Sequence, residues 1–304
     1  MKALVIGYGS IGSRHARILS ELGCRVAVVT AREDADAPLR FASVSGAVSE
    51  FAPDYAVIAT ETARHGEGIA QLVRSGFRGT LLVEKPLCPL PCALPPSAFQ
   101  DAYVAYNLRF HPLVQRLREL LASEEILSVQ AYVGQYLPLW RPGRDYREVY
   151  SADKGAGGGV LRDLSHELDL LNWLLGGWQR LVAVGGRFSR LEIDSDDIFS
   201  IMMATGRCPV VAVQMNYLDR VGRRRIIVNT QERTIEVDFV AGKLFVDGAC
   251  EEFQVDRDHS YREMHRSLLG ACRRDLCTIA EGMTVVGMIA AAERSVEEER
   301  WVVK

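Results

Sequence analysis

The chain has 304 residues, of which 48% are hydrophobic and 25% charged, as is ordinary for a globular protein. At roughly 150 residues per domain, this length predicts two domains. Lys and Arg (36) nearly balance Asp and Glu (39), and this balance argues against a protein that works by wrapping nucleic acid. No apolar run reaches the 18 or so residues of a membrane span, and no signal peptide precedes the first glycines, so we expect a cytoplasmic protein without a membrane partner.

The cysteines predict reduced thiols. Seven are scattered along the chain, an odd number in a chain without a signal peptide. The only close pairs are Cys88 with Cys92 and Cys272 with Cys277. Neither pair has the two-residue gap common in zinc sites, so we expect no metal.

The first thirty residues have the pattern of a dinucleotide-binding unit. Lys2–Ile6 is a short apolar run suited to a buried parallel strand, and Gly7–Gly12 follows at once. Apolar residues then recur at helical spacing over Ile11–Leu22, Gly23 ends that helix, and Arg25–Thr30 is the next strand. This order of strand, glycine turn, helix and strand is the context that the dinucleotide fingerprint requires.

Each glycine of the turn has a physical role. Gly7 permits the tight turn, Gly9 has no side chain to block a pyrophosphate, and Gly12 lets the helix pack close to the strand. The helix N-terminus then offers unpaired N–H groups and the positive end of its dipole to the phosphates. The predicted cofactor contacts in this loop are Gly7, Tyr8, Gly9, Ser10, Ile11 and Gly12.

The end of the second strand bears on the cofactor type. An Asp or Glu there would bind the ribose 2′-hydroxyl of NAD. The sequence instead has Thr30 and Arg32, with acids only at Glu33 and Asp34. A missing carboxylate with a nearby arginine predicts NADP, with NAD as the alternative. The competing interpretation is that Arg32 is a solvated loop residue.

The alternation continues through the first half of the chain. Asp54–Thr60, Thr80–Val83 and Ala102–Tyr106 are predicted strands, and His65–Ser75 is a predicted helix. In doubly wound sheets the ligand lies at the carboxyl ends of the strands. The residues there complete the predicted cofactor site: Ala59, Thr60, His65, Glu84, Lys85 and Asn107. We expect a dinucleotide-binding Rossmann domain over residues 1–110.

After residue 110 the regular alternation of predicted strands and helices ends. Pro112–Ala122 and Thr284–Glu298 are predicted helices. Between them, alternating strands begin with inward-facing Val129, Ala131 and Val133 and continue at Phe199–Ala204, Val210–Tyr217, Arg225–Asn229, Thr234–Phe239 and Lys243–Val246. This rhythm predicts an α+β domain over residues 111–304 with an open, mostly antiparallel sheet, one face packed on helices and the other facing a partner subunit. The fold class is therefore α/β, a doubly wound parallel sheet followed by this second domain.

Two features interrupt the second half. The irregular segment Leu137–Gly159 is long enough to be functional. A helix is predicted over Ser165–Leu175 with Ser165 as its N-cap, and Asp163 and His166 stand at its first turn.

The long segment supplies candidate substrate contacts. Arginine forks bind carboxylate or phosphate, and aromatic rings stack on sugars. The candidates are Trp140, Arg141, Arg144 and Tyr146. We expect an anionic sugar or nucleotide-sugar, against the alternative that the arginines, Arg147 included, pair with acids such as Asp145 and Glu148. Arg223–Arg225 is predicted to be a solvated turn.

The chain resembles the Gfo/Idh/MocA family of NAD(P)-dependent oxidoreductases over nearly its whole length. Four ordered features carry the resemblance: Gly7–Gly12, Ala59–His65, Glu84–Pro86 and Gly157–His166. Tyr106–Pro112, with Arg109 as a further candidate substrate contact, resembles the link between the family's two domains. The resemblance implies hydride transfer between a nicotinamide and a carbinol carbon of a sugar, inositol or nucleotide-linked form, and a dimer or tetramer through the open sheet face.

The resemblance also implies site residues. Lys85 matches the active-site lysine and His166 the active-site histidine. Asp163 lies three residues before this histidine where the family places an aspartate four before it, and Arg162 takes that fourth place. The sequences around Trp140 and Asp163 are similar to those of a bacterial subgroup linked to nonulosonic-acid and surface-glycan genes.

The expected mechanism needs a base and an electrostatic partner. A histidine suits proton removal from the substrate hydroxyl, and the helix dipole would keep His166 neutral. Asp163 or Asp169 would orient its ring, and Lys85 would stabilise the developing alkoxide. The alternatives are a structural His166 and a solvated Lys85. The rival functions are a non-catalytic regulator that binds dinucleotide or sugar, and a reductase of a non-sugar carbonyl.

Overall fold

The computed structural model describes residues 1–32, 36–37, 39–93, 98–270 and 272–304, so Glu33, Asp34 and the end of the proline-rich stretch lie outside the described residues. It divides into two compact units. Unit 1 consists of Met1–Phe110 with Arg257–Thr284, and unit 2 of His111–Asp256 with Val285–Lys304. The sequence pattern predicted one boundary and gave no sign that 257–284 returns to unit 1. None of the described helices has the length and apolarity that a membrane span requires.

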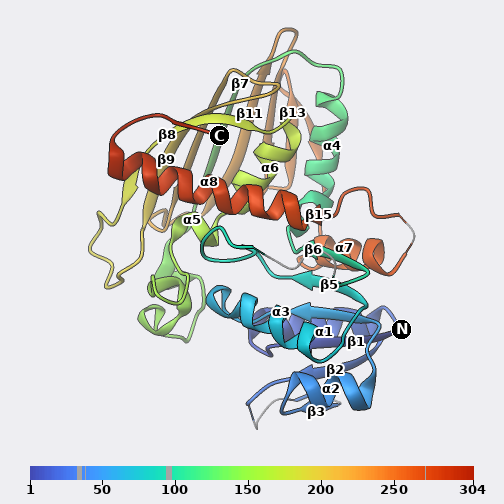
Figure 1. The fold of residues 1–304 in the computed structure, drawn as a ribbon. Coiled ribbons are helices and arrows are strands. Elements are labelled where there is room, and N and C mark those ends of the chain that lie inside the picture. Colours follow the sequence, from blue (N-terminus) through green and yellow to red (C-terminus); the bar gives the residue numbers. More distant parts are fainter. Residues whose placement is uncertain (33–35, 38, 94–97, 271) are drawn as a thin grey trace. The chain divides into compact units, whose positions relative to one another are not determined.

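Unit 1 contains the predicted parallel sheet (Figure 1). In spatial order its described strands are β3 (Arg40–Phe41), β2 (Arg25–Val29), β1 (Lys2–Ile6), β4 (Tyr55–Ile58), β5 (Thr80–Val83), β6 (Asp101–Val104) and β15 (Cys277–Thr278). All neighbours are parallel except β15 and β6. The first six strands follow the order of a dinucleotide-binding doubly wound sheet, which confirms the predicted fold class for this half.

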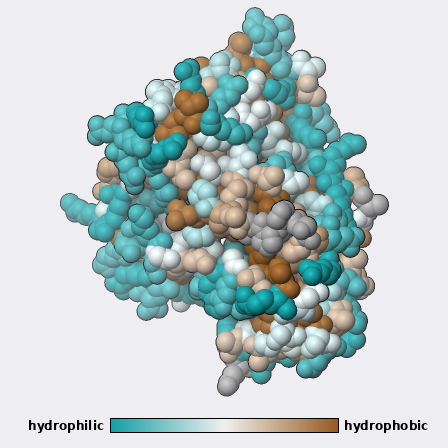
Figure 2. Space-filling model, in the orientation of Figure 1, coloured by the Kyte–Doolittle hydropathy of each residue, from teal (hydrophilic) through white to brown (hydrophobic). Residues whose placement is uncertain are grey.

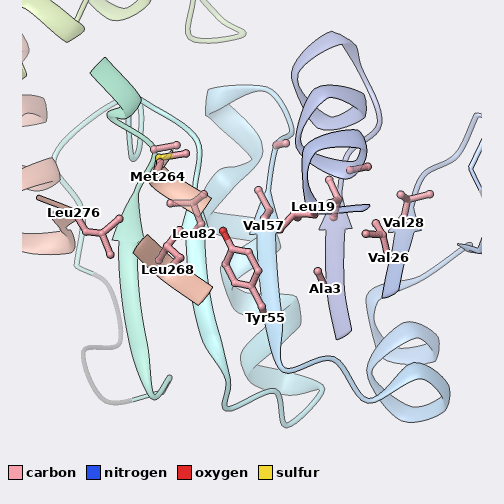
Figure 3. Packing of buried hydrophobic residues seen from close by; sticks show 14 residues of the cluster. Ala3, Leu19, Val26, Val28, Tyr55, Val57, Leu82, Met264, Leu268 and Leu276 are labelled. Atoms are coloured by element: carbon pink, nitrogen blue, oxygen red, sulfur yellow. The ribbon is translucent and has the colours of Figure 1, made fainter. Parts of the chain in front are cut away.

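Two described helices of unit 1, Ser10–Glu21 and His65–Arg74, match the apolar periodicity of the sequence, and two others were not predicted. The described helices are α1 (Ser10–Glu21), α2 (Val44–Phe51), α3 (His65–Arg74) and α7 (His259–Leu269), with the 3-10 turns η1 (Thr62–Arg64) and η2 (Asn107–Phe110). The strands are continuous apolar runs because both of their faces are buried. Figure 3 shows Met264 and Leu268 of α7 beside Leu82 of β5 and Tyr55 of β4, so the returning segment contributes to the core of unit 1.

Unit 2 is built on a second sheet. In spatial order its described strands are β14 (Ala249–Glu252), β13 (Lys243–Val246), β12 (Thr234–Asp238), β11 (Arg223–Thr230), β7 (Ile126–Gly134), β10 (Val210–Asn216), β9 (Ile198–Thr205), β8 (Trp178–Gly186) and β16 (Val302–Val303). Neighbours are antiparallel except β7 and β10, which run parallel. The sheet is therefore mostly antiparallel, as predicted.

One face of this sheet is buried and the other is open. Val129, Ala131 and Val133 of β7 are at most 5% exposed, which confirms their inward orientation. Figure 1 shows α6 and α8 in front of the long strands, and Ser295 of α8 accepts a hydrogen bond from the Ala183 backbone N–H of β8 at 2.9 Å. The molecular face in Figure 2 is largely hydrophilic, with hydrophobic residues in separate patches.

The helices of unit 2 differ from the prediction at their starts. They are α4 (Pro112–Leu121), α5 (Val160–Asp163), α6 (His166–Leu174) and α8 (Ile279–Glu298), with 3-10 turns at Leu137–Leu139, Tyr146–Glu148 and Tyr150–Ala152. Ser165 is the N-cap residue of α6, as predicted, but its backbone is already helical and its side chain makes no capping hydrogen bond. Helix α8 begins at Ile279, earlier than the predicted Thr284, and its first residues belong to unit 1.

The interpretation of Arg223–Arg225 as a solvated turn is also wrong. These residues begin strand β11, and each arginine forms an ion pair with a carboxylate. Arg224 pairs with Glu167 at 2.6 Å, and Arg225 pairs with Asp238 at 2.8 Å. Neutralisation by neighbouring acids allows three successive arginines to lie in a sheet.

Candidate active site

The glycine loop connects β1 to α1 at the carboxyl end of the sheet in unit 1. Gly7 has φ +93°, and a Cβ there would lie 2.7 Å from the Ala59 carbonyl oxygen. A Cβ on Gly12 would lie 2.0 Å from the Gly7 carbonyl oxygen. A Cβ on Gly9 would meet no protein atom within 4 Å. The fold itself therefore requires Gly7 and Gly12, whereas Gly9 faces space that a ligand can fill.

The start of α1 leaves its positive end available. Gly9 is the N-cap residue, no side chain caps the helix, and no acidic residue occupies its first turn. Unpaired backbone N–H groups and the helix dipole favour an anion at such a position. Of the other predicted contacts, Ser10 is exposed, Ile11 packs at the edge of the core, and the Tyr8 hydroxyl donates to the Asp36 carbonyl oxygen at 2.7 Å.

Two arginines lie near the carboxyl end of β2, Arg32 in the segment that follows it and Arg40 in β3. The Arg32 backbone N–H donates to Thr30 Oγ1 at 3.1 Å, and the Arg40 guanidinium donates to the Arg32 carbonyl oxygen at 3.1 Å. Both arginine side chains are exposed. Sequence reasoning missed Arg40, because its proximity to Arg32 depends on the pairing of β3 with β2.

His65 connects the ends of β4 and β5. Its Nε2 lies 3.1 Å from the Thr60 carbonyl oxygen, and its Nδ1 lies 3.1 Å from that of Pro86. The side chain is 1% exposed, and this burial lowers the pKa of His65 despite the nearby carbonyls. These contacts place His65 as a tie between the segment that follows Ala59 and the one that follows Lys85.

Glu84 lies inside unit 1. Its Oε1 is 2.9 Å from His15 Nε2, and its Oε2 accepts the Lys85 backbone N–H at 3.0 Å. Burial alone would raise the pKa of Glu84, but the hydrogen bond and charge of His15 lower it below its ordinary value. The carboxylate thereby fixes the backbone of Lys85, whose side chain is partly exposed.

The bond to His15 is the first in a buried chain. His15 Nδ1 lies 2.8 Å from His265 Nε2, and His265 Nδ1 lies 3.1 Å from the Tyr55 hydroxyl. Burial, with His15 nearby, lowers the pKa of His265 well below its ordinary value, so His265 is neutral. The ionised Glu84 carboxylate can only accept, so His15 donates to it from Nε2, whereas the donor in the other two bonds depends on the tautomers of the two rings. We call these four residues the buried histidine chain, and sequence reasoning missed it because its members lie in β4, α7, α1 and the segment after β5.

Asn107 and Arg109 lie in η2. Asn107 is 5% exposed, and its Oδ1 has no hydrogen-bond partner among the described residues, as expected of a group that meets a ligand. Arg109 is 1% exposed, and its guanidinium pairs with Glu281 at 3.0 Å. Arg109 thus forms an ion pair within unit 1, and its expected substrate contact stays a prediction.

In unit 2, the glycine run brings α5 against the long loop. A Cβ on Gly158 would lie 2.2 Å from the Tyr150 carbonyl oxygen, and Gly159 has φ +113°. At the end of α5, Asp163 is 6% exposed and accepts a hydrogen bond from the Tyr217 hydroxyl at 2.6 Å. Burial, with the charge of Asp163, raises the pKa of Tyr217 well above its ordinary value, so the phenol keeps its proton. Asp163 is therefore held by a tyrosine, a partner that the sequence did not predict.

His166 is the first residue of α6 and is partly exposed. The next residue, Glu167, is 2% exposed and pairs with Arg224 at 2.6 Å. His166 is therefore partly accessible to solvent, whereas the Glu167 carboxylate is occupied by an ion pair inside unit 2. Among the described residues, no group of three or more His, Cys, Asp or Glu side chains has an arrangement that could hold a metal ion.

The long loop forms a small recess, open to solvent, within unit 2. The loop recess is lined by Leu137, Pro138, Trp140, Arg141, Arg144, Tyr146, Val149 and Ser151. The Arg141 guanidinium lies 5.6 Å from the centre of the Tyr150 ring. Arg147, by contrast, pairs with Asp145 and Glu192 at 2.6 and 2.7 Å. Arg147 thus pairs with acidic residues, as the alternative interpretation expected. Arg141 and Arg144 line the recess together with the predicted aromatic residues.

Comparison with protein families gives a match within unit 2. Residues 114–236 match the family model of the GFO/IDH/MocA C-terminal domain. This segment runs from α4 to β12 and includes the glycine run, Asp163 and His166. A search of the curated proteins gave no match.

Solved structures share the fold along the whole chain. GenD2 from gentamicin A biosynthesis, in complex with NAD, is 21% identical with a TM-score of 0.82, covering 100% of this chain and 96% of that one. Levoglucosan dehydrogenase, in complex with NADH, is 18% identical with a TM-score of 0.84, covering 100% and 98%. The WlbA dehydrogenase from Bordetella pertussis, in complex with NADH and UDP-GlcNAcA, is 19% identical with a TM-score of 0.79, covering 100% and 98%.

Proposed function

We propose that the protein is an NAD(P)-dependent dehydrogenase that transfers hydride between a nicotinamide and a carbinol or carbonyl carbon of a sugar, sugar acid or nucleotide-sugar. The observation that carries the proposal is the glycine loop. Gly7 and Gly12 are required by backbone contacts, whereas Gly9 faces open space at the uncapped start of α1. A loop of this geometry at the carboxyl end of β1, in a sheet of this strand order, suits a dinucleotide pyrophosphate.

The solved structures support the same function. All three were determined with NAD or NADH, and the WlbA structure also holds a nucleotide-sugar. The match of residues 114–236 to the GFO/IDH/MocA C-terminal domain fits an oxidoreductase of the family that the sequence resembles.

The residues present fit a bound dinucleotide. The loop Gly7–Gly12 would hold the pyrophosphate, and the buried Asn107 Oδ1, without a described partner, would accept a hydrogen bond from the ligand. When bound, the dinucleotide supplies or accepts the hydride. Two exposed arginines, Arg32 and Arg40, lie near the end of β2, and this cationic pair favours a 2′-phosphate and hence NADP over NAD.

Two residues carry the proposed acid–base chemistry, His166 and Lys85. His166 accepts the proton of the substrate hydroxyl during oxidation and returns it during reduction. The Lys85 ammonium holds the substrate oxygen and stabilises negative charge that develops on it. The Glu84 carboxylate positions Lys85 through its backbone N–H, and Asp163, held by Tyr217, supports the turn before His166.

The loop recess favours an anionic substrate. Arg141 and Arg144 lie beside Trp140 and Tyr146, so a carboxylate or phosphate can bind the cations while a sugar ring stacks on an aromatic face. This chemistry fits a sugar acid or nucleotide-sugar, including the nonulosonic-acid class. We expect Arg141→Ala to raise KM for an acidic substrate at least tenfold and to leave KM for a neutral analogue within twofold.

The open face of the unit 2 sheet favours a homodimer or homotetramer. Met202 and Val184 lie on it, 43% and 72% exposed, and Met202 is paired across strands with Val182 and Ala212. Apolar side chains on an unpaired sheet face mark an interaction surface. Light scattering at micromolar concentration tests this, with Met202→Glu expected to shift the mass towards the monomer. A wild-type monomer would contradict the proposal.

The first experiment is a titration of the purified protein with NADPH and NADH, followed by nicotinamide fluorescence. We expect both to bind and NADPH to bind more tightly, with Arg32→Ala weakening NADPH at least fivefold and NADH less than twofold. Tighter binding of NADH would overturn the NADP preference alone. Binding of neither would overturn the proposed function.

The second experiment tests turnover. A panel of sugars, sugar acids and nucleotide-sugars is incubated with the preferred cofactor, and Lys85→Met is assayed on any substrate found. Lys85→Met is expected to lose at least a hundredfold in kcat while retaining dinucleotide affinity. Dinucleotide binding without turnover on any member would favour a regulator that binds dinucleotide or sugar.

A further inference from the structure

Two thiols meet in the segment that follows Lys85. Cys88 Sγ and Cys92 Sγ lie 3.0 Å apart. A disulfide has an S–S distance of about 2.05 Å, so roughly 1 Å of motion separates the two thiols from a bond. Two prolines, Pro89 and Pro91, lie between the cysteines and restrict the backbone that holds them together.

The two thiols differ in access. Cys92 is exposed, whereas Cys88 is only 5% exposed. Burial, with Cys92 beside it, raises the pKa of Cys88 to about 12, so the Cys88 thiol is a poor first nucleophile. An external oxidant therefore meets Cys92 first, and Cys88 is positioned to resolve the product.

The other close pair lacks this arrangement. Cys272 is exposed and Cys277 buried, as in the first pair, but the Cys277 thiol is directed to the Thr278 carbonyl oxygen at 3.6 Å. Cys250 is a further exposed cysteine, in strand β14. Cys250 and Cys272 therefore provide controls for an exposed thiol outside the Cys88–Cys92 pair.

We propose that Cys88 and Cys92 form a reversible intramolecular disulfide in response to a low-molecular-weight disulfide of the glutathione type. Both thiols are held at near-bonding distance, one exposed and one buried, which suits an attacking and a resolving cysteine. The site is a redox modification site, distinct from the proposed hydride transfer.

The reaction takes place in two balanced steps. Cys92 loses its proton and attacks one sulfur of the oxidant, whose S–S bond breaks, so a mixed disulfide forms and one thiol leaves. Cys88 then loses its proton to solvent and attacks Cys92 Sγ, the mixed disulfide breaks, and the second thiol leaves. Two protein thiols are oxidised, and one external disulfide is reduced to two thiols.

The experiment uses the reduced full-length protein and glutathione disulfide. Samples are quenched in acid, denatured, alkylated and digested with trypsin. Residues 79–109 form a single tryptic peptide, because Pro86 protects the bond after Lys85, and this peptide contains Cys88 and Cys92 but no other cysteine. Its mass separates dithiol, mixed disulfide and internal disulfide without any reference to enzyme activity.

We expect the internal disulfide to accumulate at an oxidant-to-thiol ratio at least tenfold lower than that needed to modify Cys250 or Cys272, and to disappear on addition of reduced dithiothreitol. Cys88→Ser should stop at the mixed disulfide on Cys92, and Cys92→Ser should leave Cys88 unmodified. Circular dichroism verifies that both variants are folded. A mixed disulfide as the stable wild-type product, or modification no easier than at Cys272, would overturn the proposal.

Discussion

The buried histidine chain gives a quantitative test of the structure of unit 1. Replacement of His265 by Leu removes the central ring, which is 0% exposed, and leaves His15 Nδ1 and the Tyr55 hydroxyl without their bonds of 2.8 and 3.1 Å. Each buried polar group left unsatisfied costs about 1–3 kcal/mol. Leucine fills much of the volume, so we expect His265→Leu to lower the free energy of unfolding by about 2–6 kcal/mol at neutral pH.

The same substitution changes the pH dependence. Burial keeps the pKa of folded His265 well below its ordinary value, whereas the unfolded chain takes up the proton near pH 6.5. The stability that neutral His265 contributes is therefore present above pH 6.5 and is lost as the pH falls, by up to about 1.4 kcal/mol per pH unit. The variant lacks this contribution. The difference in free energy of unfolding between the wild type and His265→Leu should therefore shrink by up to about 1.4 kcal/mol for each pH unit below pH 6.5.

The measurement is urea denaturation between pH 5 and 8, followed by far-ultraviolet circular dichroism and by hydrogen–deuterium exchange of unit 1 peptides. All four tryptophans lie in unit 2, so their fluorescence reports that unit separately. His259→Leu, at the partly exposed first turn of the same helix, is the control and should cost less than about 0.5 kcal/mol. The reasoning would be refuted if His265→Leu lowered the free energy of unfolding by less than about 1 kcal/mol, or if the difference from the wild type did not change with pH.

Two further predictions concern the glycine loop of unit 1 and the Asp163 contact of unit 2. Gly12→Ala places a Cβ 2.0 Å from a backbone carbonyl oxygen, so it should lower the thermal stability of unit 1 and abolish NADH binding. Gly9→Ala meets no protein atom, so it should keep the thermal stability and weaken the affinity for NADH at least tenfold. Equal stability of the two variants would contradict the loop geometry. Tyr217→Phe removes the 2.6 Å hydrogen bond to buried Asp163 and should cost about 1.5–3 kcal/mol in urea denaturation. The control Tyr132→Phe, at a half-buried bond of 2.9 Å to a carboxylate, should cost less, and the reverse order would count against the assignment.

Local patterns were enough to predict the architecture of both halves. The apolar runs of β1, β4 and β5 predicted a parallel sheet, because strands buried on both faces cannot alternate. The glycine spacing identified the loop between β1 and α1, and the steric need at Gly12 is local because its Cβ would meet the Gly7 carbonyl oxygen. The steric need at Gly7 comes from Ala59, which is distant in sequence. Alternation in β7 likewise predicted which of its residues face the core.

Other features depended on residues that are distant in sequence. His15 and His265 meet only because the segment 257–284 returns to unit 1, and no local pattern encodes that return. The same holds for Arg109, which is buried against Glu281, and for the Arg223–Arg225 run, whose carboxylate partners lie on other elements or in the adjoining turn. Periodicity and backbone sterics are local and can be predicted from the sequence, whereas the partner of a buried charge is chosen by tertiary packing and was decided only by the structure.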